Sequence, residues 1–337
     1  MQDLKHSYSN GVFNKKIVVL GPTPLPYGGV SVHIQRVIDI FKKQKNKIFV
    51  FDSTQIYTSY TRYLVRLFFF VTSHWPDIVY YHTPDGNDYY ELHTLRYLQS
   101  LFKFKLIIID HDCRYLFDRD SNFKAIYNNL LKQVAQIVFI GEITYKSYIS
   151  NNMYIPKSFS IESSYSPPNI DNKDNEWLKY PKLLHQFVKS HSPVLAMSVY
   201  KFTLLNGEDL YGVDLAIKAM IGLREKYSKV GLVCAVGDDK ASDYYQVIQH
   251  IIKENNLEEN VYFLHGDHAL WPLFFHIDLF IRPTRSDSYG ISIAEAIDCG
   301  IPALASDVCV RHKNAHIFKN EKDFFPKISM ILNCIKA

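Results

Sequence analysis

Residues 279–295, LFIRPTRSDSYGISIAE, decide the fold that we expect for this chain. The run 279–281 has the length and apolar character of a buried strand, and a helix is predicted to begin near Ser292. A polar loop joins the two. A strand that leads through a loop into a helix is the repeating unit of a parallel sheet covered by helices on both faces. This stretch therefore predicts an α/β fold.

The same alternation recurs on both sides of this stretch, with one interruption. In YSPPNI (165–170) a Pro-Pro pair breaks the pattern, because proline continues neither a helix nor a central strand. We therefore predict two doubly wound, Rossmann-like domains, 1–166 and 167–337. A polar segment follows the Pro-Pro pair and runs to about His191. The final helix is a candidate to pack back on the N-terminal domain. The predicted strands are 16–20, 47–51, 78–81, 106–109, 137–140, 194–198, 230–236, 261–264, 279–281 and 303–305, and the predicted helices are 30–41, 63–70, 89–102, 213–221, 244–252, one from about Thr144 and one from about Ser292.

Composition excludes several classes of protein. The 337 residues are 47% hydrophobic and 21% charged, which is typical of a globular protein. Lysine and arginine number 38 against 34 acidic residues, so the net charge of +4 gives no electrostatic argument for a nucleic-acid partner. The five cysteines form no CxxC pair, which favours reduced thiols in the cytoplasm.

No targeting, membrane-spanning or metal-binding pattern is evident in the sequence. The N-terminal stretch lacks the apolar centre of a signal peptide, and no apolar run approaches the roughly 18 residues that indicate a transmembrane helix. The fourteen histidines include no HExxH or comparable ligand array, and no Asp-x-Asp pair follows a strand. We therefore expect a cytoplasmic protein without a metal ion.

Two loops at predicted carboxyl ends of strands are candidate binding sites, because ligands of open parallel sheets bind there. In the first loop, Gly28 and Gly29 let the backbone approach a ligand, and the following helix N-terminus favours an anion. A plain turn explains this loop equally well. In the second loop, Ser292 and Glu295 have the spacing of a capping box, which offers a structural explanation for both. Capping does not explain Asp287 and the two arginines of that loop.

The segment SDSYGISIAEAIDCGIPALASDV (286–308) resembles the donor-binding motif of the retaining family 4 glycosyltransferases, which have the GT-B fold. The resemblance extends over nearly the whole chain in the expected order, through PLPYGGVSVHIQRV, IIIDHDCRY, SPPNI, DLYGVDLAIKAM, and VGDD followed by NVYFLHG. It implies two Rossmann-like domains that face each other across a cleft, the first on the acceptor side and the second binding a nucleotide diphosphate sugar. The RPTRSD and DLYGVD variants are similar to enzymes of bacterial surface-polysaccharide (O-antigen or capsule) assembly.

The resemblance assigns roles in the donor domain residue by residue. Glu295 matches the family glutamate that holds the ribose. Asp287 stands where the family has a glutamate that contacts the transferred sugar, so its side chain is one methylene shorter. The family's Lys-Gly pair is Tyr211-Gly212 here. This leaves Lys201 as the first candidate cation for the diphosphate, with Arg282 or Arg285 as a substitute. The full set of predicted donor-binding residues is Gly28, Gly29, Lys201, Arg282, Tyr289, Gly290, Ile291, Ser292 and Glu295.

His111 follows the predicted strand 106–109, and the resemblance implies that it acts near the reacting sugar or the acceptor. Its neighbours Asp110, Asp112 and Arg114 are candidates to orient it or the acceptor. His82 also ends a strand, but we favour a structural role for it. The implied reaction retains the anomeric configuration by front-face attack, in which the leaving phosphate takes the acceptor proton, and it needs neither a metal ion nor a cofactor.

The acceptor is less constrained by the sequence. The resemblance to surface-polysaccharide enzymes implies a glycan acceptor linked to a lipid at the inner membrane. The basic and aromatic segment 62–70 is a candidate for peripheral contact with that membrane, although a buried helix explains it as well. Two other functions stay open: a GT-B epimerase of nucleotide sugars, which needs no acceptor, and a non-catalytic module that binds sugar nucleotides.

Overall fold

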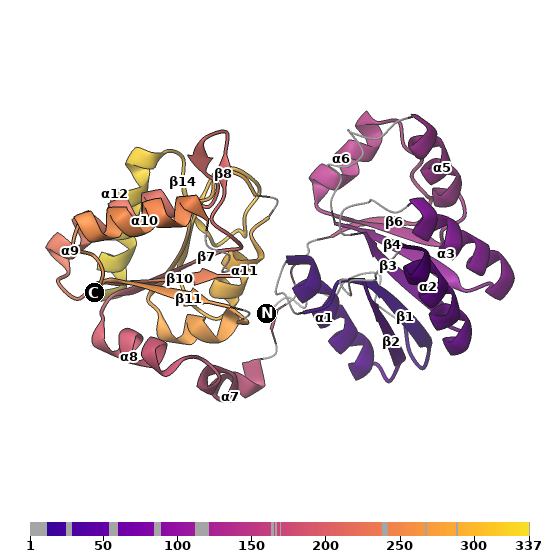
Figure 1. The fold of residues 1–337 in the computed structure, drawn as a ribbon, viewed down its shortest axis with the longest axis horizontal. Coiled ribbons are helices and arrows are strands. Elements are labelled where there is room, and N and C mark those ends of the chain that lie inside the picture. Colours follow the sequence, from indigo (N-terminus) through magenta and orange to yellow (C-terminus); the bar gives the residue numbers. More distant parts are fainter. Residues whose placement is uncertain are drawn as a thin grey trace. The chain divides into compact units, whose positions relative to one another are not determined.

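The computed structural model describes residues 12–24, 29–53, 60–83, 89–111, 121–162, 165, 167–168, 170–237, 242–266, 268–287 and 289–336. The chain divides into two compact units, Met1–Ser166 and Pro167–Ala337, and each has its own parallel sheet (Figure 1). The predicted pair of Rossmann-like domains is therefore confirmed.

In the described part of the first unit, six parallel strands form one sheet in the order β2-β1-β3-β4-β5-β6. Helices alternate with these strands along the chain, as the sequence predicts. The strands are β1 (Lys16–Gly21), β2 (Lys47–Asp52), β3 (Ile78–Thr83), β4 (Lys105–Asp110), β5 (Gln136–Ile140) and β6 (Phe159–Glu162), and the helices are α1 (Gly29–Lys43), α2 (Tyr60–His74), α3 (Tyr89–Phe102), α5 (Ser121–Leu131) and α6 (Glu142–Ser150).

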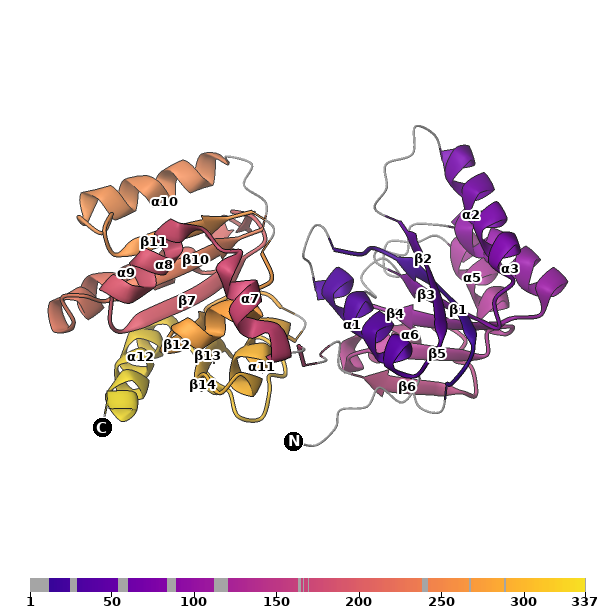
Figure 2. The same ribbon diagram turned by 90° about the horizontal axis from the view of Figure 1, so that it is seen from below.

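Both faces of this sheet are buried. Ile17 and Val19 of β1 lie in an apolar cluster with α1, whereas Val18 and Leu20 lie in a second cluster with α2, α3 and α5. Figure 2 shows α1 on one face of the sheet and α2 and α3 on the other. Because successive side chains of a strand point to opposite faces, a strand buried on both sides needs apolar residues at every position. This explains the unbroken apolar run of β1.

The strand order of the first unit reverses at β1, which pairs with β2 on one side and with β3 on the other. The chain builds outward to β2 and then crosses back to β3. A reversal of this kind leaves a crevice at the carboxyl ends of the two central strands, where ligands of doubly wound sheets bind. In the first unit, β1 and β3 end at this crevice.

The second unit repeats the arrangement with a sheet in the order β11-β10-β7-β12-β13-β14, which reverses at β7. Its candidate crevice therefore lies at the carboxyl ends of β7 and β12. In the described residues the strands are β7 (Val194–Val199), β8 (Leu204–Leu205), β9 (Glu208–Asp209), β10 (Gly231–Val236), β11 (Val261–His265), β12 (Leu279–Arg282), β13 (Ala303–Ser306) and β14 (His316–Phe318), and the helices are η2 (Ile170–Asn172), α7 (Lys173–Leu178), α8 (Lys182–Ser190), α9 (Val213–Lys226), α10 (Asp243–Glu254), η3 (Trp271–His276), α11 (Ile291–Asp298) and α12 (Glu321–Lys336).

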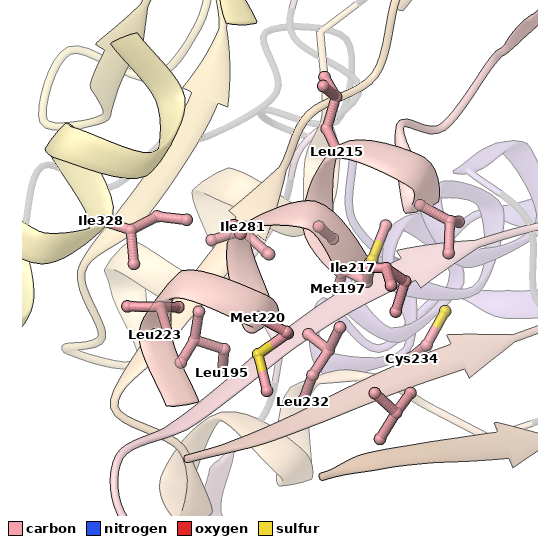
Figure 3. Packing of buried hydrophobic residues seen from close by; sticks show 14 of the residues in the cluster. Leu195, Met197, Leu215, Ile217, Met220, Leu223, Leu232, Cys234, Ile281 and Ile328 are labelled. Carbon is pink, nitrogen blue, oxygen red and sulfur yellow. The ribbon is translucent and has the colours of Figure 1, made fainter. Parts of the chain in front are cut away.

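The main core of the second unit lies between its sheet and helices α9, α10 and α12. Met220 and Leu223 of α9 pack in this cluster with Leu195 of β7 and Leu232 of β10 (Figure 3). Ile328 brings α12 into the same cluster. The final helix, a candidate to pack back on the N-terminal domain, thus places its buried apolar residues in the core of its own unit.

Several elements were not predicted, and two groups of them illustrate the reason. The edge strands β6 and β14 are short and only partly buried, so their apolar alternation is weak. The polar segment before His191 forms α7 and α8. In α8, Leu184 is fully buried, and Phe187 and Val188 pack against the same core at partial exposure. These apolar positions recur at helical spacing, but polar and charged residues dominate the composition of the segment. Among the described residues, no helix combines the length and the apolar character needed to span a bilayer.

Candidate functional site

The reversal of the second sheet brings the polar loop of residues 283–290 to the predicted crevice. β12 ends at Arg282, and α11 begins at Ile291 with Gly290 as its N-cap residue in the left-handed conformation, at a φ of 76°. This loop therefore connects the end of a central strand to the first turn of α11. The unbonded N–H groups of a first helical turn favour anions.

Asp287 lies between two buried guanidinium groups. Its Oδ2 accepts a hydrogen bond of 2.5 Å from Nε of Arg282 and one of 2.6 Å from Nη1 of Arg311. The side chain of Asp287 is 10% exposed, and those of Arg282 and Arg311 are 16% and 2% exposed. Two positive charges and one negative charge leave this cluster, Arg282–Asp287–Arg311, with a net charge of +1.

The electrostatics of the cluster keep Asp287 ionised. Burial raises the pKa of this carboxyl group, but the charges and hydrogen bonds of Arg282 and Arg311 outweigh burial and lower the pKa to about 2. The pKa of Arg282 is raised because the attraction of Asp287 exceeds the effect of its own burial. The net positive charge of the cluster is therefore maintained at neutral pH, and it favours an anionic ligand.

Arg311 was not predicted as a site residue. Its Nε donates to the carbonyl of Ser306, its Nη2 to the hydroxyl of Ser306, and its Nη1 to the carbonyl of Tyr289 as well as to Asp287. Arg311 lies outside any helix or strand, so no periodic pattern pointed to it. A Cβ at Gly290 would lie 2.4 Å from Nη1 of Arg311, so the glycine also makes room for the cluster.

Ser292 and Glu295 do not form a capping box. A capping box requires the serine at the N-cap position, but that position is occupied by Gly290, and Ser292 is the second residue of α11. The hydroxyl of Ser292 instead accepts a hydrogen bond of 3.4 Å from Nη1 of Arg282. Glu295 lies one turn farther on, with 6% of its surface exposed. The capping-box explanation of these two residues is therefore wrong.

A second loop, residues 209–212, borders the first. The Asp209 carboxylate accepts hydrogen bonds from the backbone N–H groups of Tyr211, Gly212 and Asp214, and so caps the start of α9. The hydroxyl of Thr284 donates to the carbonyl of Leu210, which joins the two loops. Gly212 has a φ of 72°, and a Cβ there would lie 2.1 Å from the carbonyl oxygen of Pro283.

The other basic residues near this crevice differ in their surroundings. Lys201 is exposed, two residues beyond the end of β7. Arg285 binds both carboxylate oxygens of Asp214 at 3.0 Å and also binds Glu321 at 2.9 Å. Its charge is therefore balanced by acidic side chains of its own unit, which does not favour it as a substitute cation for a diphosphate. Burial raises the pKa of Tyr211, the residue that replaces the expected lysine.

In the first unit, three histidines gather at the reversal of the sheet. His111 directly follows β4, and its Nε2 lies 3.0 Å from Nδ1 of His82 near the end of β3. His33 of α1 is fully buried and contacts His111 with a ring-centroid distance of 5.0 Å. Burial lowers the pKa of His111 to about 3, so its imidazole is neutral at physiological pH.

Of the remaining predicted site residues in the first unit, some lie among the described residues and others lie outside them. Gly29 is the first residue of α1, whereas Gly28 lies outside the described residues, as do Asp112 and Arg114. Asp110 is fully buried at the end of β4 and accepts a hydrogen bond of 2.5 Å from the hydroxyl of Tyr148. That hydrogen bond directs the Asp110 carboxylate toward α6.

We expect Gly212→Ala to lower the free energy of unfolding of the second unit by about 3 kcal/mol, because alanine adds left-handed strain and a collision with Pro283. The matched control is Gly300→Ala, since Gly300 has a φ of 85° with no atom within 4 Å of the added Cβ, and only strain of about 1 kcal/mol applies. Urea unfolding followed by the fluorescence of Trp177 and Trp271 measures the difference. Equal losses for the two variants would contradict the close approach of Gly212 to Pro283.

We expect Asp287→Asn to destabilise the second unit by about 3 kcal/mol at pH 7, because two buried arginine charges lose their partner. The folded-state pKa of Asp287 lies below its unfolded value, so its stabilisation is present above pH ~4 and is lost as the pH falls toward 2. The difference between wild type and variant should therefore shrink on acidification. Asp307→Asn, which removes an exposed carboxylate of the same unit, is the control, and a loss equal to that of Asp287→Asn would contradict the ion-pair interpretation.

Comparison with known proteins places these features in context. Residues 205–323 match the family model for glycosyl transferases group 1. Over 98 residues, which are 29% of this chain and 25% of the relative, the chain is 31% identical to lipopolysaccharide glucosyltransferase WaaG of Escherichia coli K12. Over 97 residues, again 29% and 25% of the two chains, it is 26% identical to O-antigen biosynthesis glycosyltransferase WclY of Escherichia coli. The matched segments thus span about a quarter of these curated relatives.

The structural similarity to known proteins covers much more of this chain than the sequence similarity does. The crystal structure of Anabaena Alr3699/HepE in complex with UDP and glucose matches with a TM-score of 0.61 at 16% identity, covering 96% of this chain and 90% of that chain. The chain therefore has the GT-B fold, and residues 205–323 of its second unit match the glycosyl transferases group 1 model.

Proposed function

We propose that this chain is a retaining glycosyltransferase, which moves a sugar from a nucleotide diphosphate sugar to a glycan acceptor. The observation that carries the proposal is the cluster Arg282–Asp287–Arg311, with its net positive charge beside the first turn of α11. A buried positive cluster and free helical N–H groups suit the diphosphate of such a donor. The match of residues 205–323 to glycosyl transferases group 1 supports the same activity.

The second unit is the donor-binding domain in this proposal. Glu295, buried in the first turns of α11, accepts hydrogen bonds from the ribose hydroxyls. Arg282 and the exposed Lys201, at the ends of the two central strands, balance the diphosphate charge. The backbone from Tyr289 to Ser292 supplies N–H donors. The complex of Anabaena Alr3699/HepE with UDP and glucose supports a donor of this class.

Negative charge grows on the leaving diphosphate as the bond to the sugar breaks, so donors and cations fixed toward that charge accelerate the reaction. In the proposed front-face attack, the acceptor O–H loses its proton to the leaving phosphate while the new bond forms on the same face. This route needs no metal ion and no separate general base. His111 acts near the reacting sugar or the acceptor.

Asp287 contributes in two ways within this mechanism. The family resemblance assigns its carboxylate to the transferred sugar. Two of its acceptor positions already bind Arg282 and Arg311, so Asp287 also positions these guanidinium groups. Because its side chain is shorter than the glutamate expected there, we propose that Asp287 contributes more to holding the arginines than to contacting the sugar.

The acceptor in this proposal is a lipid-linked glycan of bacterial surface-polysaccharide synthesis, and the similarity to WaaG and WclY supports this class. The first unit is its acceptor side. The α2 helix has one buried face, and its exposed side chains Arg62, Val65, Arg66 and Phe69 recur at helical spacing. Val65 and Phe69 are 49% and 65% exposed. Basic and apolar residues on one exposed helix face suit peripheral binding to an anionic membrane on the cytoplasmic side.

The enzymatic proposal is tested with pooled UDP-, GDP- and dTDP-sugars and lipid-linked acceptors, with products identified by mass spectrometry. We expect a glycosylated acceptor and no product from donor alone. A modified sugar nucleotide without acceptor would identify an epimerase instead. Donor binding without turnover over a broad acceptor panel would identify a non-catalytic module.

We expect Glu295→Gln to weaken the binding of the reactive sugar nucleotide about 10–100-fold, because a charged acceptor for two hydroxyls becomes a neutral one. Asp298→Asn is the matched control, since it removes an exposed carboxylate from the same helix. Isothermal titration with the donor measures both variants. Unchanged affinity in Glu295→Gln would remove Glu295 from the donor site.

We expect the double variant Val65→Glu, Phe69→Glu to bind vesicles of anionic phospholipid about tenfold more weakly than wild type, because two apolar side chains become charged. Val247→Glu, at a 49% exposed apolar position of α10 in the second unit, is the control. Cosedimentation with the vesicles gives the bound fraction. Equal binding by all three proteins would contradict a membrane contact through α2.

A further inference from the structure

Three imidazole groups lie together in the first unit, although no sequence pattern links them. His33 comes from α1, His82 from β3 and His111 from the position just after β4. One ring nitrogen of each lies within 4.8 Å of the corresponding nitrogens of the other two. The closest pair, Nδ1 of His82 and Nε2 of His111, is 3.0 Å apart. We call these residues the histidine cluster.

Rigid elements hold the histidine cluster in place. β3 and β4 are neighbouring parallel strands, and His82 pairs in register with Ile109, two residues before His111. The helix that carries His33 is anchored to the sheet by Ile34, Val37 and other buried residues of its apolar face. His33 and His82 are fully buried. Sites built on strands and helices keep their geometry better than sites on loops.

The three imidazole rings of the histidine cluster lie in planes of different orientation. The planes of His33 and His111 are inclined at 76°, and those of His33 and His82 at 63°. His82 and His111 are closer to parallel, at 24°, with their centroids 5.3 Å apart. Imidazoles that approach a common point from different directions are the arrangement that a tetrahedral ion requires.

We propose that His33, His82 and His111 form a binding site for a divalent transition-metal ion, with Zn²⁺ as the ion that fits best. Ligand nitrogens about 2.05 Å from a tetrahedral Zn²⁺ lie about 3.3 Å from one another. Nδ1 of His82 and Nε2 of His111 are 3.0 Å apart, which is already close to this spacing. No two of the ligand nitrogens are more than 4.8 Å apart. The most distant pair would therefore have to approach by at most about 1.5 Å to bind one Zn²⁺ ion.

The chemistry of the ligands selects the class of ion. The group contains three imidazoles and neither a carboxylate nor a thiolate from the described part of the chain. Mg²⁺ and Ca²⁺ prefer oxygen ligands, so an all-imidazole set disfavours them. Three histidines with water or another small ligand in the fourth position are an established zinc environment in proteins. No HExxH spacing indicates this site in the sequence, because its three ligands come from three separate parts of the fold.

Occupancy of the histidine cluster has a consequence that rests on the proposed function. His111 is the residue assigned to the neighbourhood of the reacting sugar or acceptor, and a nitrogen bound to Zn²⁺ no longer accepts or donates a hydrogen bond there. The proposed metal site and the proposed transfer therefore share the side chain of His111. The binding of the ion itself does not depend on the transferase activity.

The test is titration of the full metal-free chain with Zn²⁺ by isothermal calorimetry, and with Co²⁺ by visible absorption. We expect one ion per chain and the intense absorption of tetrahedral Co²⁺. The variants His33→Gln and His82→Asn each remove one metal ligand. Removal of a group that only hydrogen-bonds to a ligand typically weakens metal binding roughly 10–100-fold. We expect each variant to bind Zn²⁺ more weakly than the wild type by more than this factor. The absence of a stoichiometric ion in the wild-type protein would overturn the proposal, and so would a Zn²⁺ affinity of both variants equal to that of the wild type.

A matched control separates the histidine cluster from adventitious surface binding. His250 and Glu254 form an exposed pair one turn apart on α10, at 3.1 Å, which is the kind of surface site that zinc also occupies. His250→Gln should leave the tight binding event unchanged. If it removes the binding instead, the ion belongs to the surface pair and the proposal is wrong.

Two further measurements keep the test decisive if a buried-histidine variant fails to fold. X-ray absorption of the zinc-loaded wild-type protein should show imidazole scattering from three histidines, and oxygen ligands alone would contradict the site. Zn²⁺ should also raise the melting temperature of the wild-type protein, because an ion that binds only the folded state stabilises it. Donor binding without zinc binding would overturn this inference alone, whereas zinc binding without donor binding would overturn only the proposed function.

Discussion

Parallel strands that reverse their order beside a central strand determine where polar side chains gather in this molecule. The first sheet reverses at β1 and the second at β7. Each reversal leaves the carboxyl ends of two central strands without a crossing connection above them, and polar side chains gather at both positions. The histidine cluster lies at one reversal and the cluster Arg282–Asp287–Arg311 at the other.

The ion pairs of the cluster Arg282–Asp287–Arg311 depend on the backbone conformation at Gly290. An aspartate between two arginines is stable in a buried place only if hydrogen bonds satisfy all three groups, and Arg311 therefore also binds Ser306 and the carbonyl of Tyr289. Gly290 must lack a side chain for this approach, and its left-handed conformation starts α11 at the same point. One glycine thus serves both the ion pair and the helix N-terminus.

The proposed metal site and the proposed front-face mechanism are compatible because the first concerns the metal-bound state of the first unit and the second its metal-free state. The proposed transfer uses no metal ion, and the same proposal assigns His111 a place near the sugar or the acceptor. Burial, which lowers the pKa of His111, maintains the neutral form of its imidazole. A neutral imidazole nitrogen is also the form that binds a transition metal, so the proposed metal site and the proposed transfer both require the neutral form of His111.

The sequence by itself determined the fold class, the alternation of strands and helices, and the loop that carries Asp287, because apolar periodicity depends only on neighbours in the chain. It also suggested a capping box at Ser292, which the start of α11 at Ile291 rules out. Only the tertiary structure decided that Arg311 contacts Asp287 and that His33 meets His82 and His111. These residues are separated by many positions, and the strand order that brings them together is not encoded in any local pattern.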